Sequence, residues 1–254
     1  MFDVTRLVPE ARPIAQKAAT VYVHHAGDDF VGLIAHGSAV KGGFIVGCSD
    51  IDFQLYVHPR ALDLAGHLPF ELTVSIHSDL SRIEPSPFRY IQCYAFSSEH
   101  RRAGWVGPVP GTYALIAGRL PTAEATAVEL RTSAARAIAE LPPSGVPPYL
   151  ADTLLDHGGG RLAQRVRLLC TDVWPALYQL LITHGGDPIA VWIMTKQQAI
   201  DSLPVDGDAA EAIRAFYAAV LSYYPSESSA LAGLEVMVHG VAFLRAAAGE
   251  NASR

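Results

Sequence analysis

Short apolar runs separated by glycine and proline dominate the first half of the chain. Residues 30–35 (FVGLIA) form one such run, which predicts a buried strand. Alternation or aromatic content predicts three more strands, over residues 50–57, 88–96 and 113–117. Apolar side chains at helical spacing predict two helices, over residues 9–25 and 68–83. Strands mixed with helices in this way indicate a small α/β unit.

The second half of the chain is rich in alanine and leucine at helical spacing. The apolar stripes predict four helices, over residues 122–141, 161–183, 209–224 and 228–248. Thr122 is the expected N-cap of the first of them. Pro175 lies inside the second and predicts a kink or a restart, whereas residues 142–148 (PPSGVPP) predict a loop. We therefore expect a helical bundle here.

The change in pattern places a domain boundary near Pro121, with an α/β domain over 1–120 and a helical domain over 121–254. The net charge of −6 divides unevenly, because residues 1–120 sum to −1 and residues 121–254 to −5. An acidic chain without a basic stripe does not favour binding to an extended nucleic acid. With half of its residues hydrophobic, the chain is also not a disordered one.

The cysteines and the first 20 residues give an expectation for the cellular compartment of the protein. The three cysteines are far apart in the sequence, which favours reduced thiols in the cytoplasm over disulfides or a zinc site. The first 20 residues lack a basic stretch followed by an apolar run, so we expect no signal peptide. No uninterrupted run reaches 18 apolar residues, so we expect no membrane-spanning segment. A homodimer is left open.

The chemistry-bearing segment is 33–57, LIAHGSAVKGGFIVGCSDIDFQLYV. Asp50 and Asp52 are two positions apart on a predicted strand, so both carboxylates are expected on one face. Two such charges need a cation between them or a shared proton, and hard oxygen ligands suit Mg²⁺. Gly37 lets the backbone approach closely, and Ser38 with the following amides can hold phosphate oxygens. His36 is expected to be a hydrogen-bonded residue at the strand end.

The spacing Gly-Ser, eleven residues, Ser-Asp-Ile-Asp between two apolar strands resembles the signature of the DNA polymerase β-like nucleotidyltransferase superfamily. A softer likeness links residues 174–200 to the helical half of aminoglycoside adenylyltransferases. The resemblance implies a small mixed-sheet catalytic domain followed by a C-terminal helical bundle.

The resemblance also implies roles for particular residues. Asp50 and Asp52 would coordinate Mg²⁺ or Mn²⁺, and Gly37 and Ser38 would bind the triphosphate of ATP. Lys196 would be a phosphate contact near the start of a helix; the alternative is a solvated lysine in a first helical turn. The implied reaction transfers AMP to a hydroxyl of a small molecule, such as an aminoglycoside, and releases pyrophosphate.

One position departs from the family pattern. The third carboxylate of the family is expected on the strand over 88–96, where this chain has Gln92, which cannot act as a base. Six carboxylates remain as alternatives: Glu71, Asp79, Glu84 and Glu99 nearest in sequence, and Asp156 and Asp172 in the helical part. Asp172 is alternatively a cap for a helix that restarts around Pro175.

Two rival functions follow from this departure and from the family. Gln92 is compatible with a catalytically weak or inactive nucleotide-binding regulator. A protein acceptor is also compatible, as in AMP-transferring components of toxin–antitoxin pairs.

Overall fold

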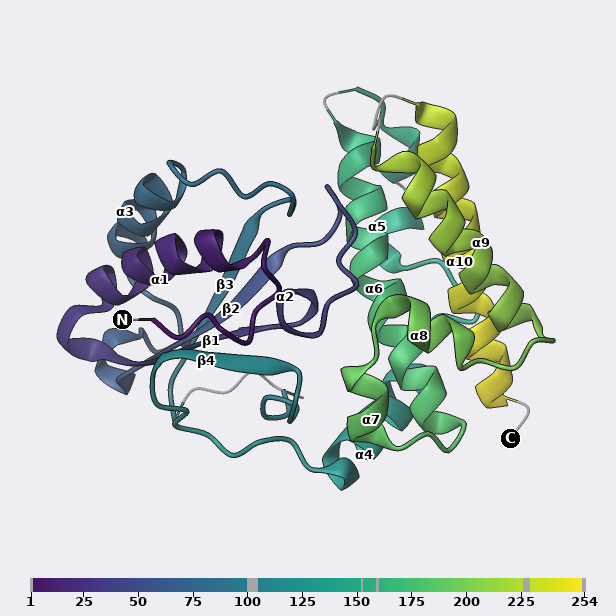
Figure 1. Cartoon of the computed structure of the whole chain (residues 1–254). Helices are drawn as coiled ribbons and strands as arrows, with labels where there is room; N and C mark the ends of the chain where they lie inside the picture. Colours follow the sequence, from purple (N-terminus) through teal and green to yellow (C-terminus); the bar gives the residue numbers. More distant parts are fainter. Residues whose placement is uncertain (1, 100–104, 152, 159, 226–228, 253–254) are drawn as a thin grey trace. The chain divides into compact units, whose positions relative to one another are not determined.

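The computed structural model describes residues 2–99, 105–151, 153–158, 160–225 and 229–252. The chain divides into two compact units, Met1–Thr126 and Ala127–Arg254. The first combines a sheet with helices and the second is helical (Figure 1).

The first unit is built on a four-stranded sheet in the order β3-β2-β1-β4. Its strands are β1 (Phe30–His36), β2 (Ile51–Val57), β3 (Ile91–Phe96) and β4 (Tyr113–Gly118). β1 runs antiparallel to β2 and β4, whereas β3 runs parallel to β2, so the sheet is mixed, as expected. All four predicted strands are present, but β2 begins one residue later than predicted and β3 three residues later.

The helices of the first unit pack on one face of the sheet (Figure 1). They are α1 (Arg12–Ala26), α2 (Ser38–Lys41) and α3 (Phe70–Leu80), with 3₁₀ turns η1 (Gly27–Asp29) and η2 (Pro59–Ala61). Ile14 and Ala18 of α1 are buried against Leu33 of β1 and Phe53 of β2. Because side chains alternate along a strand, this core takes every second residue of β1 and β2.

The opposite face of the sheet has a different character. Ile34, Tyr56 and Phe96 form a small buried cluster there, and Trp105 stacks on Phe96 with ring centroids 5.1 Å apart. The same face carries polar side chains toward the end of the sheet at which β1 ends and β2 begins. This face, and not the helix-covered one, therefore exposes chemistry-bearing residues.

The second unit consists of helices. They are α4 (Ala127–Ala139), α5 (Pro148–Ala151), η3 (Thr153–Leu155), α6 (Arg161–Thr183), α7 (Pro188–Ile193), α8 (Lys196–Asp201), α9 (Asp208–Tyr223) and α10 (Ala230–Ala252). α6 has the predicted bounds, and it continues through Pro175, so the predicted restart is wrong. Val173, Trp174 and Leu177 around the proline are all buried, and this packing holds the helix together.

Some helix starts differ from prediction. α4 begins at Ala127, so Thr122 is not its N-cap. Sequence analysis missed α7, in which Asp187 caps the helix by accepting a hydrogen bond from the Ala190 amide at 2.8 Å. α8 begins with a capping box between Thr195 and Gln198. α7 and α8 are short helices. Their caps are local signals of a helix start that involve only a few residues, unlike the apolar stripe of a long helix.

Within the described residues one helical segment, Ala230–Glu250 of α10, is long and apolar enough to cross a membrane by length and composition, with a mean hydropathy of 1.4. The expectation from the sequence considered only uninterrupted apolar runs, so it did not identify this segment. α10 packs along α9 and α6, and its Val236, Phe243 and Ala247 are fully buried. Part of its apolar surface thus lies in the core of the helical unit, whereas Leu231, Leu234 and Val238 of the same helix are exposed.

Candidate active site

A row of polar side chains crosses the four strands on the face opposite α1 and α3. His36 of β1 lies directly opposite Asp52 of β2, and Asp52 in turn pairs with Gln92 of β3. Tyr113 of β4 pairs with His36 on its other side. Residues paired in register point to the same face of a sheet, so all four side chains share one face.

The turn after β1 fits against this row. Gly37 has φ +72°, a left-handed conformation that favours glycine, and its amide donates to the Thr112 carbonyl at 3.1 Å. A Cβ atom at Gly37 would lie 3.1 Å from Asp52 Oδ2. The missing side chain therefore makes room for the carboxylate. Ser38, which begins α2, is buried beside it.

Asp50 does not lie on β2 as predicted, but immediately before it. Its neighbours continue the pairing with the segment before β3: the Arg89 amide donates to the Ser49 carbonyl at 2.8 Å, and the Ile51 amide to the Tyr90 carbonyl at 3.1 Å. Ser49 is buried, and its hydroxyl accepts from the Ile45 amide at 2.9 Å. The backbone at Asp50 is thus fixed on both sides.

His36 differs from its expected role. Its Nε2 atom is buried and has no hydrogen-bond partner among the described residues. Burial lowers the pKa of His36 to about 4, although the negative charge of Asp50 acts in the opposite direction. The imidazole is therefore neutral at neutral pH, and it offers one unused ring nitrogen beside the two aspartates.

Gln92, at the position where the third carboxylate was expected, is held on both sides. Tyr90 donates its hydroxyl to Gln92 Oε1 at 2.7 Å, and Gln92 Nε2 donates to the Tyr94 hydroxyl. Sequence analysis missed this ladder, although tyrosines two residues before and after Gln92 must share its face of the strand. The amide orientation is fixed by these two tyrosines.

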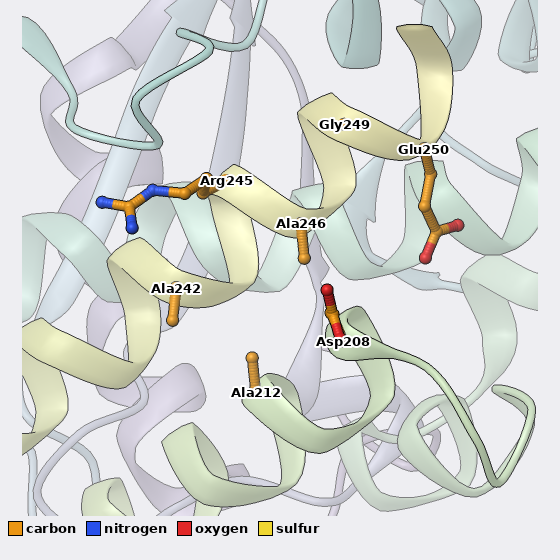
Figure 2. Close-up of a pocket in the computed structure, with 7 residues that line it drawn as sticks. All are labelled: Asp208, Ala212, Ala242, Arg245, Ala246, Gly249 and Glu250. Atoms are coloured by element: carbon orange, nitrogen blue, oxygen red, sulfur yellow. The ribbon is translucent and has the colours of Figure 1, made fainter. Parts of the chain in front are cut away.

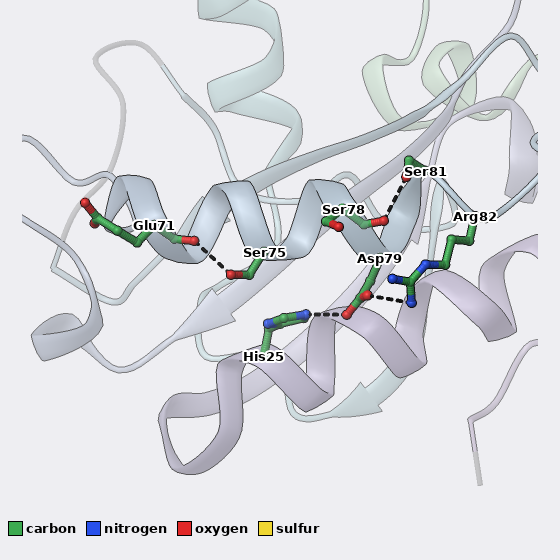
Figure 3. Close-up of polar contacts among 7 residues, drawn as sticks. All are labelled: His25, Glu71, Ser75, Ser78, Asp79, Ser81 and Arg82. Carbon is green, nitrogen blue, oxygen red and sulfur yellow. Dashed lines mark hydrogen bonds and ion pairs between the residues drawn. The ribbon is translucent and has the colours of Figure 1, made fainter.

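The carboxylates nearest in sequence do not supply the missing charge. Glu71 and Asp79 lie on α3, which covers the opposite face of the sheet, and Asp79 there contacts His25 at 2.8 Å and Arg82 at 3.2 Å (Figure 3). Glu99 follows the far end of β3. Glu84 lies in the loop before β3, where it accepts a hydrogen bond from the Ser86 amide at 3.2 Å.

The three candidate site residues of the helical unit, two carboxylates and one lysine, lie in different surroundings. Asp172 lies within α6 and accepts a hydrogen bond from the Tyr149 hydroxyl at 2.6 Å, so the predicted cap is wrong. Asp156 is exposed in the segment before α6. Lys196 is the first residue of α8, and its Nζ lies 5.6 Å from the centroid of the Trp174 ring, a cation–π distance.

The donor set at Asp50 and Asp52 fits a hard divalent cation. No group of three or more histidine, cysteine, aspartate or glutamate side chains that could hold a metal occurs in the described part of the chain. Mg²⁺ is commonly bound by one or two carboxylates with waters and substrate phosphates as the other ligands. The space that Gly37 leaves beside Asp52 Oδ2 suits such an arrangement.

The helical unit contains a hollow of about 700 Å³ between α9 and α10. Figure 2 shows Asp208 and Ala212 of α9 facing Ala242 and Ala246 of α10. Glu250 at its edge is paired with His184, with 2.6 Å between Oε2 and Nε2. All the residues that line the hollow belong to the second unit.

Comparison with known proteins identifies the fold. No protein-family model matches the sequence, and no curated protein matches it either. Among solved structures, the chain is similar to the spectinomycin adenyltransferase AAD(9) from Enterococcus faecialis, a structure with ATP and spectinomycin. The TM-score is 0.52 at 13% sequence identity, over 91% of this chain and 98% of that chain. The chain therefore has the fold of AAD(9), a mixed four-stranded sheet followed by a helical region.

Proposed function

We propose that the protein is a Mg²⁺-dependent nucleotidyltransferase that transfers AMP from ATP to a hydroxyl of a small acceptor of the aminoglycoside type. The observation that carries the proposal is the placement of Asp52 against the Gly37 turn, in a fold shared with AAD(9). Asp50 and Asp52 hold the metal, and Gly37 with Ser38 contacts the triphosphate. Lys196 is a further proposed phosphate contact.

The proposed reaction is a displacement at the α-phosphorus of ATP. The acceptor oxygen forms a bond to that phosphorus, the bond to the bridging oxygen breaks, and pyrophosphate leaves. When bound, Mg²⁺ neutralises triphosphate charge. The hydroxyl proton must pass to a base, and Gln92 cannot accept it. The proposed acceptor of this proton is the unused ring nitrogen of His36, a water molecule or a carboxylate outside the row.

The helical unit is the proposed binder of the acceptor. Residues 121–254 carry a net charge of −5, which favours a cationic acceptor over an anionic one. A polyamine-like sugar with several amino groups has this chemistry. We further propose that the enzyme works in the bacterial cytoplasm, where it would confer resistance to its acceptor.

Pyrophosphate release tests this proposal. Purified protein is incubated with ATP, Mg²⁺ and a panel of cationic and neutral aminocyclitols, including spectinomycin. We expect release that depends on one acceptor and that falls by at least about a hundredfold in Asp50→Asn with Asp52→Asn. Ser229→Ala, on the helical unit, is the matched control. Release that survives the double aspartate variant would overturn the assignment.

Gln92 supports one second candidate, a nucleotide-binding protein without turnover. Because an amide stands beside Asp52 instead of a carboxylate, the row has one charge and one proton acceptor fewer. Calorimetry with ATP and Mg²⁺ separates the two candidates. Binding that is lost in Asp52→Asn, together with no pyrophosphate for any acceptor, favours the second. A labelled protein band after incubation with radioactive ATP and lysate would instead favour a protein acceptor.

A further inference from the structure

The first unit contains a cavity that the proposed transfer does not use. It measures about 220 Å³ and lies between α3 and β3, on the sheet face opposite Asp52. Its floor includes Leu55 of β2 with Cys93 and Ala95 of β3, and its roof includes Ile76 and Leu80 of α3. The strand residues alternate with those of the polar row, so the cavity lies directly behind the strands that carry Asp52 and Gln92.

The polar residues in the cavity wall are few: Tyr22, Thr73, His77 and Cys93. Tyr22 of α1 and Cys93 interact with each other at one end. Burial raises the pKa of Cys93 to about 12 and raises that of Tyr22 as well, so both are neutral at neutral pH. Thr73, also in the lining, donates its hydroxyl to the Phe70 carbonyl at 2.7 Å.

The roof of the cavity is fixed by contacts outside it. Asp79 of α3 lies 2.8 Å from His25 Nε2 of α1, and the Arg82 side chain lies 3.2 Å from its other oxygen (Figure 3). The hydrogen bond from His25 is the largest influence that lowers the pKa of Asp79. These contacts attach α3 to α1, so the helix spans the space above β3 without filling it.

We propose that this cavity binds a small uncharged molecule, aromatic or aliphatic, with one hydrogen-bonding group directed at Tyr22 and Cys93. An apolar cavity of about 150 Å³ is already large enough to bind benzene. The larger volume here accommodates a bicyclic ring. Most of the lining is apolar, so an uncharged ligand is favoured over a charged one; His77, on the exposed side of α3, is the lining residue that could partner a charge.

The probe for this proposal is 5-fluoroindole, followed by ¹⁹F NMR in the absence of ATP. We expect saturable broadening with a Kd on the order of 0.1–1 mM, and weaker binding of 5-fluoroindole-2-carboxylate. Ala95→Leu fills the floor and should weaken binding by about tenfold or more. Val74→Leu enlarges an exposed residue on the outer face of the same roof helix and should leave the Kd unchanged. Equal binding to the native and Ala95→Leu proteins would overturn the proposal, as would no binding to the native protein.

A second measurement serves if circular dichroism shows that Ala95→Leu does not fold. Cys93 and Cys48 of the native chain are alkylated with N-ethylmaleimide, and the extent is read by peptide mass mapping. Saturating 5-fluoroindole should slow modification of Cys93 by about tenfold and leave Cys48, which lies outside the cavity, unaffected. An unchanged Cys93 rate would refute the site. Neither readout depends on nucleotidyl transfer, so the outcome is independent of the proposed function.

Discussion

Gln92 lies beside Asp52 in the parallel register of β3 and β2, and its amide is held between Tyr90 and Tyr94. An amide at this point gives the row one negative charge fewer than a third carboxylate would. It also leaves this side of Asp52 without a proton acceptor, whereas His36, paired with Asp52 on the other side, offers a neutral ring nitrogen. Nucleotidyl transfer by this protein therefore depends on whether Asp50 and Asp52 suffice without a third carboxylate.

Gln92→Glu should raise pyrophosphate release if the site is a transferase that lacks its base. A positioned general base contributes about 10²–10⁴ to a rate, so we expect a gain of at least about tenfold at saturating Mg²⁺. Gln92→Ala, which removes the amide without adding a carboxylate, is the control. A glutamate variant no faster than the alanine variant would show that the proton leaves by another route.

The long elements could be predicted from the sequence because their apolar stripes repeat. The 161–183 prediction matches α6 residue for residue, and β1 differs by one residue. Pro175 misled the prediction, because the gain from burying Trp174 and Leu177 outweighs the local cost of proline in a helix. Tertiary packing decides such cases, and a local pattern does not contain it.

The residues of the candidate site could be predicted from the sequence, but the strand pairing that brings them together could not. Spacing alone placed Asp52 near the Gly37 turn. The register that sets Asp52 beside Gln92 and His36 depends on contacts between strands far apart in sequence. The unsatisfied Nε2 of His36 likewise follows from burial by neighbours that are distant along the chain.

Gly37→Ala should disturb the site more than Gly42→Ala, which changes a nearby glycine that also has a positive φ. A Cβ at Gly37 would displace Asp52 Oδ2, which lies 3.1 Å away, whereas a Cβ at Gly42, φ +80°, meets no atom within 4 Å. Both glycines combine a positive φ with a strongly negative ψ, a conformation essentially restricted to glycine, so each alanine should cost about 1–3 kcal/mol. Only Gly37→Ala should also weaken ATP binding with Mg²⁺, by about tenfold in calorimetry. Equal affinities in the two variants would contradict the proposed contact.

Asp172→Asn should change how stability depends on pH. Burial raises the pKa of Asp172, against the hydrogen bond from Tyr149. Folding therefore favours the protonated carboxyl, and this contribution is lost as pH rises from about 4 through the raised pKa. Relative to the native chain, the asparagine variant should gain stability between about pH 4 and about pH 7, as measured by urea unfolding. Asp156→Asn, a charge change at an exposed position, is the control, and a pH-independent difference for Asp172→Asn would refute the argument.

Gly240→Ala should destabilise the helical unit, although alanine is normally the better helix former. A Cβ at Gly240 of α10 would lie 2.6 Å from Leu169 Cδ2 of α6 and 3.0 Å from Phe216 Cε2 of α9. Overpacking of this kind costs about 1–3 kcal/mol. Gly249 lies on the same helix, but a Cβ there meets no atom within 4 Å, so Gly249→Ala should instead gain about 0.5–1 kcal/mol. Urea unfolding followed by circular dichroism measures both. A stabilising Gly240→Ala would mean that α10 does not approach α6 and α9 as closely as these distances require.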